Sequence, residues 1–266
     1  MSEVNPNMGP DALAVTLLDG APRLLGVSGL QGSGKSTVAR TMARLAGERG
    51  VRAVSLSLDD FYLGHDARQA LGREVHPLLA TRGVPGTHDL HLLLSTLDAL
   101  VDPATHWPLA VPRFDKGRDD RAPREQWPHV DGTPDLVVFE GWCLGVPPQD
   151  DIELATPVNA LERDEDADGT WRNFVNAQLG AYAAAWARID RLAVLQAPGW
   201  DVVRAWRGQA EREHAGAPRA MNDDALDRFL SHYERISRHA LRTLPARADV
   251  LVELDTTRTP LRITRR

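Results

Sequence analysis

The sequence has little of several features that would define other kinds of protein. Among its 266 residues there is one cysteine, Cys143, which excludes an internal disulfide and a cysteine-cluster metal site and suits a reducing compartment. Residues 1–15 have neither a basic start nor a long apolar run, so we expect no signal peptide and no membrane anchor. The net charge of −6 argues against nucleic acid as a partner. These absences favour a cytoplasmic protein that acts on a small molecule.

The apolar residues that are present predict one large α/β domain. Hydrophobic residues make up 42% of the chain and charged residues 26%, which is enough apolar content for a substantial core. Short apolar runs such as VVF and AVL do not alternate in polarity, and segments with helical spacing separate them. This pattern predicts a parallel sheet covered by helices on both faces. Five strands are expected, at residues 23–29, 51–60, 135–141, 191–197 and 249–255.

The remaining segments are predicted to be helices and long loops. Apolar residues recur at helical spacing over residues 36–50, 89–102, 171–190 and 222–244, and Asn222 is a candidate N-cap. Three stretches rich in glycine, proline and charge, residues 72–88, 112–134 and 145–170, are expected to be irregular and functional or mobile. The acidic run 162–169 within the last stretch is interpreted as a solvated loop rather than a metal site.

A phosphate-binding loop is the most specific motif. The segment GLQGSGKST fits the Walker A pattern G-x-x-x-x-G-K-[ST], and it stands between an apolar strand and a helix. Glycines let backbone N–H groups converge on phosphate oxygens, Lys35 reaches the terminal phosphates, and Ser36 can ligate Mg²⁺. The motif predicts a bound nucleoside triphosphate, and no NKxD or LSGGQ-like sequence points to a GTPase or an ABC-type ATPase. The expected nucleotide-binding residues are Gly29, Gln31, Gly32, Ser33, Gly34, Lys35, Ser36 and Thr37.

Carboxylates stand where two of the predicted strands end. Asp59 and Asp60 follow one strand in SLSLDDFY, and Glu140 ends another in LVVFEGW. Because ligands of open α/β sheets gather at the carboxyl edge of the strands, we expect these side chains near the phosphates, as a base or as metal ligands. Asp60 is equally well interpreted as a turn or helix-capping residue. Which of the two aspartates acts as the base stays open at this point.

Several motifs together resemble one family of kinases. The strings GLQGSGKST, SLDDFYL, RGVPGTHDL, VPRFDKGRDDRAP, FEGWCLG and NALERDEDADGTWRNFVN resemble the D-glycerate 3-kinase family, a relative of phosphoribulokinase, uridine kinase and pantothenate kinase. The resemblance spans residues 24–255. It implies a P-loop NTPase kinase fold with a helical lid, in a domain over 23–266 after an N-terminal extension over 1–22. It also implies transfer of a phosphoryl group from ATP, with Mg²⁺, to the 3-hydroxyl of D-glycerate.

The resemblance also implies roles for individual residues. Lys35 and Ser36 would serve the triphosphate, Asp59 would be the general base, and Glu140 would orient Mg²⁺ together with Ser36. The irregular segments and residues 200–220 would supply the acceptor pocket and the lid. The candidate acceptor-binding residues are Asp60, His88, Arg113, Asp115 and Lys116.

Some of these residue roles, and the acceptor itself, have a second interpretation. Asp89 is interpreted either as a helix cap or as a substrate contact. Arg204 and Arg207 are candidate lid residues, although Arg207 and Glu211 stand four apart as in a salt-bridged outer face. The acceptor could instead be another small alcohol, such as a nucleoside or a pantothenate-like compound. A P-loop binding module without turnover is the third hypothesis, and the presence of both Asp59 and Glu140 argues against it.

Overall fold

A computed structural model describes residues 2–3, 8–20, 22–213 and 222–266. The end of the predicted lid segment, residues 214–220, lies outside the described residues, as do residue 221 and residues 1, 4–7 and 21 of the predicted N-terminal extension. Within the described part of the chain, no helix combines the length and the apolar composition that crossing a membrane requires.

The central sheet has seven strands in the order β1-β11-β10-β9-β2-β8-β3. Five of them run parallel, and they confirm the five strands predicted from the sequence. These strands are β10 (Val250–Leu254), β9 (Arg191–Gln196), β2 (Leu24–Gly29), β8 (Leu136–Gly141) and β3 (Ala53–Ser57). Every residue of β2 and β8 is buried, because helices cover both faces of the sheet.

The two strands at one edge were not anticipated. β11 (Pro260–Arg265) pairs antiparallel with β10, and β1 (Ser2–Glu3) pairs antiparallel with β11. β11 buries only Pro260 and Ile263 and exposes Leu261 and Arg262 between them, so it has no continuous apolar run to reveal it. It forms because the turn after β10 brings it back along an unpaired strand edge.

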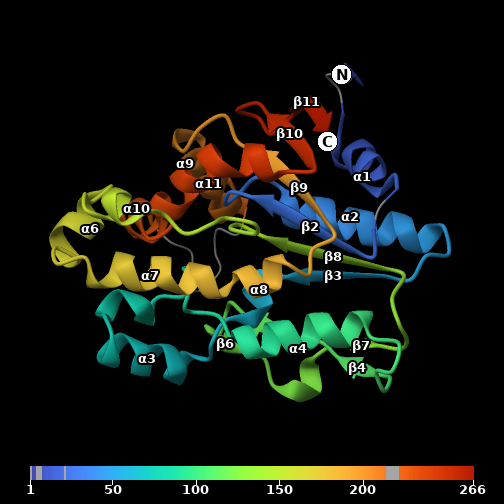
Figure 1. Ribbon diagram of the computed structural model, residues 1–266, viewed down its shortest axis with the longest axis horizontal. Coiled ribbons are helices and arrows are strands. Elements are labelled where there is room, and N and C mark those ends of the chain that lie inside the picture. Colours follow the sequence, from blue (N-terminus) through green and yellow to red (C-terminus); the bar gives the residue numbers. More distant parts are fainter. Residues whose placement is uncertain (1, 4–7, 21, 214–221) are drawn as a thin grey trace.

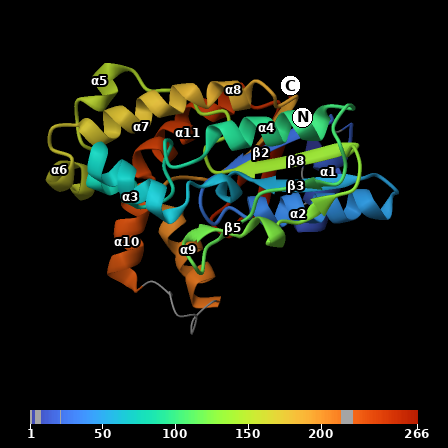
Figure 2. The ribbon, with the colours of Figure 1, turned by 90° about the horizontal axis from the view of Figure 1, so that it is seen from below.

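Helices cover the two faces of the sheet as separate layers. Helices α1 (Pro10–Leu18) and α2 (Lys35–Glu48) lie on one face, as Figure 2 shows. On the opposite face lie α4 (Leu90–Val101), α7 (Thr170–Ala181), α8 (Ala183–Trp186) and α11 (Glu234–Arg247). The predicted extension over 1–22 therefore contains a helix of the domain itself, since Leu13, Ala14 and Leu17 of α1 are buried in the core.

Two predicted helices are each broken into two. Residues 171–190 form α7 and α8 around Tyr182, and residues 222–244 form α10 (Asp223–Ser231) and α11 around Tyr233. Both tyrosines are buried and both bind loop backbone at these breaks, Tyr182 through Gly86 and Tyr233 through Arg82. The predicted N-cap is confirmed, because the N–H of Ala225 donates to Asn222 Oδ1 at 2.8 Å.

The segments predicted to be irregular contain several short elements. Helices α3, α6 and α10 lie beyond the carboxyl edge of the parallel strands (Figure 1). The remaining α-helices are α3 (His65–Glu74), α5 (Asp151–Leu154), α6 (Ala160–Glu165) and α9 (Asp201–Glu213). Three short 3₁₀ helices are η1 (Leu58–Phe61), η2 (Pro77–Ala80) and η3 (Arg124–Gln126). Two small antiparallel pairs are formed by β4 (Leu109–Ala110) with β7 (His129–Val130) and by β5 (Phe114–Asp115) with β6 (Asp120–Arg121).

Candidate active site

The phosphate loop joins the end of β2 to the start of α2. Gly32 and Gly34 have φ values of +78° and +88°, in the left-handed region that favours glycine. A Cβ atom on Gly32 would lie 2.7 Å from the Cβ of Trp206, so glycine at this position also lets helix α9 pack directly against the loop. Trp206 is itself buried, and its Nε1 donates to the Thr256 carbonyl at 2.7 Å. The loop is thus held between α9 and the turn after β10.

Polar side chains inside the loop have no protein partner. Both polar atoms of Gln31 and the hydroxyl of Ser33 are buried, and none of them forms a hydrogen bond within the described residues. Buried polar groups of folded proteins are nearly always satisfied, and exceptions mark places where a ligand or water completes the site. Together with the N-terminus of α2, these groups make the loop a site for an anion.

Glu140 lies beside this loop. The β2–β8 register places Glu140 opposite Val27, and Ser36 Oγ donates to Glu140 Oε1 at 2.8 Å. Glu140 is 4% exposed, and its Oε2 atom is buried with no partner in the described structure. A carboxylate oxygen and a hydroxyl at the edge of a phosphate site fit Mg²⁺, which binds through few protein ligands and keeps phosphates and waters in its shell. Consistent with that mode, no group of three or more acidic, histidine or cysteine side chains within the described ranges could hold a metal ion by itself.

Asp59 is held by three contacts just after β3. Its N–H donates to Ser57 Oγ at 3.3 Å at the start of η1, and its Oδ1 accepts from the Tyr62 hydroxyl at 3.0 Å. Oδ2 accepts from Lys116 Nζ at 2.6 Å. Burial alone would raise the pKa of Asp59, but the Lys116 cation, with a smaller contribution from Lys35, holds this pKa well below its usual range. Asp59 is therefore an ionised carboxylate with a defined orientation.

One cavity contains both the loop and Asp59. It has a volume of about 460 Å³, and residues of the loop and the start of α2, among them Lys35 and Ser36, line one end. Arg207 of α9 also lines it. The walls around Asp59 are formed by Tyr62, Arg82, Lys116, Trp142 and Tyr233. A phosphate chain on the loop and a second small molecule beside Asp59 would therefore share one space.

Four of the five expected acceptor-binding residues, Asp60, His88, Arg113 and Asp115, do not line this cavity. Arg113 Nη1 donates to Asp60 Oδ2 at 3.2 Å, and the N–H of Phe114 donates to the other Asp60 oxygen at 3.3 Å. Asp115 Oδ1 accepts from the N–H groups of Gly117 and of the following residue, which closes a turn. Burial raises the pKa of Asp60 despite the nearby Arg113 cation. These side chains stabilise the loop and leave Lys116, of that segment, at the cavity.

His88 lies behind the cavity wall. Its ring stacks on Tyr62 with centroids 4.4 Å apart, and its Nδ1 and the Tyr182 hydroxyl share a hydrogen bond of 2.7 Å. Burial lowers the pKa of His88 to about 3, so the ring is neutral. The structure thus places this expected acceptor-binding residue behind Tyr62 and outside the cavity lining. The neighbouring Asp89 is a helix cap, as one of its two interpretations held, because it accepts from the Leu92 N–H at 2.9 Å.

The two candidate lid residues differ in position. Arg204 pairs with Asp227 of α10 at 2.6 Å and is half-exposed, which matches the salt-bridged outer face. Arg207 lines the cavity, and its guanidinium lies 6.0 Å from the centroid of the Phe229 ring. The side chain of Glu211, the alternative partner of Arg207, lies outside the described part of the chain.

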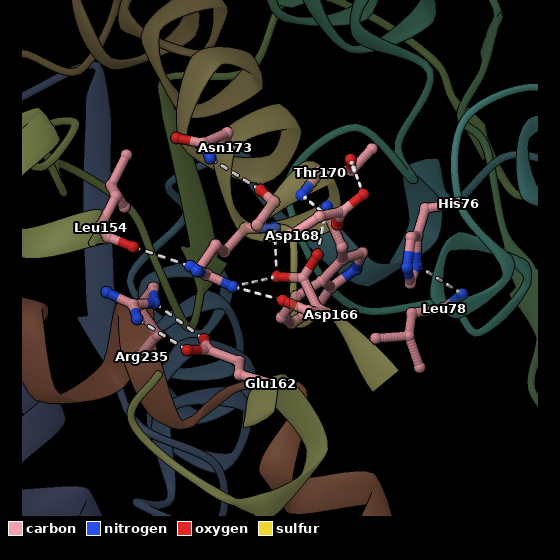
Figure 3. A network of polar contacts seen from close by, with 12 residues as sticks. His76, Leu78, Leu154, Glu162, Asp166, Asp168, Thr170, Asn173 and Arg235 are labelled. Atoms are coloured by element: carbon pink, nitrogen blue, oxygen red, sulfur yellow. Dashed lines mark hydrogen bonds and ion pairs between the residues drawn. The ribbon is translucent and has the colours of Figure 1, made fainter. Parts of the chain in front are cut away.

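Two carboxylates of the acidic run 162–169 are buried rather than solvated, whereas Asp164, Glu165 and Asp168 are exposed as expected. Glu162, which is fully buried, binds Arg235 of α11 through both carboxylate oxygens, at 2.7 and 2.6 Å. Asp166, 1% exposed, accepts from the N–H groups of Trp171 and Arg172 and pairs with the Arg172 side chain at 2.9 Å. Figure 3 shows Glu162 with Arg235 and, close to them, Asp166. This network ties α6, α7 and α11 together, and its pairing could not be anticipated because Arg235 is distant in sequence.

A second cavity, of about 340 Å³, lies on the other side of the phosphate loop. Its walls are largely apolar and come from α1, α2 and the ends of β9, β10 and β11. Sequence reasoning missed this cavity because its walls come from elements far apart along the chain. Among the residues that line it are Leu13, Thr37, Val38, Leu195, Leu254 and Pro260.

The fold and the site define a P-loop kinase: a parallel sheet, a phosphate loop between β2 and α2, and carboxylates at the ends of β3 and β8. No family model matches the chain. The chain is 34% identical over 223 residues to the uncharacterized kinase mug58 of Schizosaccharomyces pombe. The aligned residues cover 81% of this chain and 79% of that protein. It belongs to the D-glycerate 3-kinase-like family of P-loop kinases.

Two further proteins are similar over most of this chain. A chloroplastic D-glycerate 3-kinase of Arabidopsis thaliana is 33% identical over 263 residues, which cover 91% of this chain and 55% of the plant protein. The chain therefore matches about half the length of that relative. The solved structure of a D-glycerate 3-kinase from Cryptococcus neoformans superimposes with a TM-score of 0.76 at 24% identity, covering 96% of this chain and 97% of that one, which shows a shared fold.

Proposed function

We propose that this kinase transfers the γ-phosphoryl group of Mg²⁺–ATP to the 3-hydroxyl of D-glycerate, giving 3-phosphoglycerate. The observation that carries the proposal is that Asp59 faces the same cavity as Lys35 and Ser36 of the phosphate loop. The name of the plant relative, a D-glycerate 3-kinase, supports the choice of acceptor.

The nucleotide would span both cavities. Its phosphates would lie along residues 29–37, where backbone N–H groups and the Lys35 ammonium offset their charge. The base would occupy the second cavity, whose apolar walls suit an aromatic ring and which adjoins the loop through Ser33, Gly34 and Thr37. Arg207 on α9 would close over the terminal phosphates as the lid residue.

Mg²⁺ would be held by Ser36 and, through water, by Glu140, whose second oxygen has no protein partner. When bound, the ion neutralises charge on the transferred phosphoryl group. Glu140 accepts a hydrogen bond from Ser36 and so sets the direction of that hydroxyl.

Asp59 would orient the acceptor hydroxyl and take its proton. The hydroxyl oxygen forms a bond to the γ-phosphorus, the bond from that phosphorus to the ADP oxygen breaks, and the proton passes to Asp59. A low pKa suits this role because phosphoryl transfer has a loose transition state, in which positioning contributes more than basicity. Tyr62 and Lys116 each hold one oxygen of the carboxylate.

An acceptor panel tests the proposal. ADP release is measured for the wild-type enzyme with D-glycerate, L-glycerate, glycerol, pantothenate and uridine, and D-glycerate should have the highest kcat/KM. Lys35→Ala should lose on the order of a thousandfold or more in kcat, since it removes a charge from the transferred group. Arg44→Ala, on the same helix but half-exposed and outside both cavities, is the matched control. Uridine or glycerol matching D-glycerate would refute the assignment of the acceptor, and ADP release from Lys35→Ala at the wild-type rate would refute the phosphate site.

A further inference from the structure

We propose that Arg82 recognises the carboxylate of the acceptor, so that the enzyme acts on small hydroxy acids that span the distance from Arg82 to Asp59. The inference rests on the proposed kinase function and deepens it, because it names the residue that selects the substrate class. The sequence directed attention to Arg113 instead, which the structure pairs with Asp60 away from the cavity.

The guanidinium of Arg82 has donors available to a ligand. Arg82 lines the cavity, and its guanidinium carbon lies 5.5 Å from the centroid of the Phe114 ring. Nη1 donates to Asp119 Oδ1, while Nε and Nη2 have no hydrogen-bond partner within the described chain. A planar guanidinium with two unsatisfied donors matches the bidentate geometry that a carboxylate accepts.

Arg82 is also placed at the Asp59 end of the cavity. Phe114, beneath Arg82, meets the Tyr62 ring edge-on at 5.3 Å, and Tyr62 donates to Asp59. The Tyr233 hydroxyl donates to the Arg82 carbonyl at 3.3 Å. Arg82 and Asp59 are thus joined through a short series of packed rings, and both face the same space.

The other cations that line the cavity are less suited to an acceptor carboxylate. Arg40 belongs to α2, and its Nε donates to the Ser36 carbonyl at 3.3 Å. Lys35 belongs to the phosphate loop, and Lys116 is paired with Asp59 at 2.6 Å. Arg258, at the loop end, reaches the Gly32 carbonyl at 3.4 Å. Arg207 comes from α9, the helix that packs on the phosphate loop. Arg82 therefore supplies positive charge on the acceptor side, where the anionic Asp59 would otherwise repel a second carboxylate.

A buried framework holds Arg82 in place. Arg68, fully buried, pairs with Asp119 Oδ2 at 2.8 Å and donates to the Asp119 carbonyl at 3.0 Å. Asp119 has a φ of +58° and presents its other oxygen to Arg82. Arg68, Arg82 and Asp119 together carry two positive charges and one negative charge. The carboxylate of a bound acceptor would balance the remaining positive charge. Because the side chain is fixed before binding, less entropy is lost when a ligand binds.

Aromatic residues limit the size of the acceptor. Trp142 and Tyr233 line this end with ring centroids 5.0 Å apart, and Trp142 Nε1 donates to the Gly83 carbonyl at 3.2 Å. Gly83 follows Arg82 directly, so the wall and the cation are parts of one unit. A small acid offers little apolar surface to these rings, and most of its affinity must come from charge-assisted hydrogen bonds.

The test measures kcat/KM for D-glycerate and for glycerol, which lacks the carboxylate, in wild type, Arg82→Gln, Arg82→Lys and Arg113→Gln. Arg82→Gln should lower kcat/KM for D-glycerate on the order of a hundredfold, chiefly through KM, and leave the low value for glycerol within about twofold. Arg82→Lys keeps the positive charge but lacks the planar guanidinium, so its kcat/KM for D-glycerate should lie between the values of wild type and Arg82→Gln. Arg73→Gln, an exposed arginine at the end of α3, controls for loss of a surface charge. Far-UV circular dichroism and the thermal midpoint show whether each variant folds.

The outcomes separate the inference from the proposed function. If wild type uses D-glycerate but Arg82→Gln affects D-glycerate and glycerol equally, or Arg113→Gln produces the selective loss instead, the inference alone is wrong. If wild type prefers another hydroxy acid and Arg82→Gln selectively loses that activity, the inference holds and the acceptor assignment fails. If wild type prefers a neutral acceptor to every hydroxy acid of the panel, both fail. If Arg82→Gln does not fold, the same comparison on Arg82→Lys decides.

Discussion

Lys116 sets the protonation state of Asp59, and replacing it by glutamine should move the acidic limb of the pH–rate profile. Burial raises the pKa of Asp59, but the Lys116 ammonium, 2.6 Å from Oδ2, more than offsets this effect. Lys116→Gln keeps a hydrogen-bond donor of similar reach and removes the charge. Asp59 should then take up a proton at a higher pH, and activity should be lost sooner on acidification.

The size of the change follows from the exposure of the pair. An opposite charge at contact distance typically lowers a carboxyl pKa by about 1–3 units. The Lys116 side chain is 61% exposed and that of Asp59 is 30% exposed, so water screens the pair and the lower half of that range applies. The acidic limb should therefore move upward by about 1 to 2 pH units. Each unit corresponds to about 1.4 kcal/mol of differential interaction.

The assay is kcat/KM for D-glycerate from about pH 2 to about pH 8, a ratio that reports the ionisation of the free enzyme. The low starting pH is needed because the Asp59 pKa lies well below the ordinary carboxyl value of 3.8. Arg118→Gln, which removes a charge from the exposed part of the same loop, should leave the limb in place. An unchanged limb in Lys116→Gln would refute the reasoning, since another group would then hold Asp59 ionised. Equal movement in both variants would show that the charge of the whole loop, rather than the contact, sets the pKa of Asp59.

Three further predictions follow from contacts elsewhere in the site and its framework. Glu140→Gln should raise the Mg²⁺ concentration needed for half-maximal rate, whereas Asp59→Asn should lower the maximal rate and leave the Mg²⁺ dependence unchanged. A Mg²⁺ titration that gives the same dependence for both variants would contradict the separate roles of the two carboxylates. Because the pKa of His88 is lowered to about 3 from an ordinary 6.5, the unfolded chain binds this proton more tightly, and stability is lost as pH falls below 6.5. At pH 5 the loss should be about 2 kcal/mol by urea unfolding, and His88→Gln should show a smaller pH dependence. Arg235→Leu should lower the free energy of unfolding by about 3–5 kcal/mol because it leaves the Glu162 carboxylate buried and unpaired; a much smaller loss in denaturant titrations would mean that water reaches that carboxylate.

The sequence by itself determined the features that depend on near neighbours along the chain. The loop from Gly29 to Ser36, the five parallel strands and the cap at Asn222 all follow from local spacing and polarity. The positions of Asp59 and Glu140 at strand ends were also enough to predict that both lie near the phosphate loop. Neighbouring parallel strands end at the same edge of the sheet, whatever the conformation of the loops that follow them. The pairing of β8 with β2 and β3 therefore places residues at the strand ends side by side.

Only the tertiary structure decided which side chains of the irregular segments face the cavity. Arg113 turns away because Asp60, 53 residues earlier, binds it, while Arg82 is held at the cavity by Asp119, 37 residues later. His88 lies behind the cavity wall because the rings of Tyr62 and Tyr182 bury it. A long side chain in an irregular loop has no periodicity to direct it, so its orientation depends on partners contributed by distant segments, which composition and spacing cannot reveal.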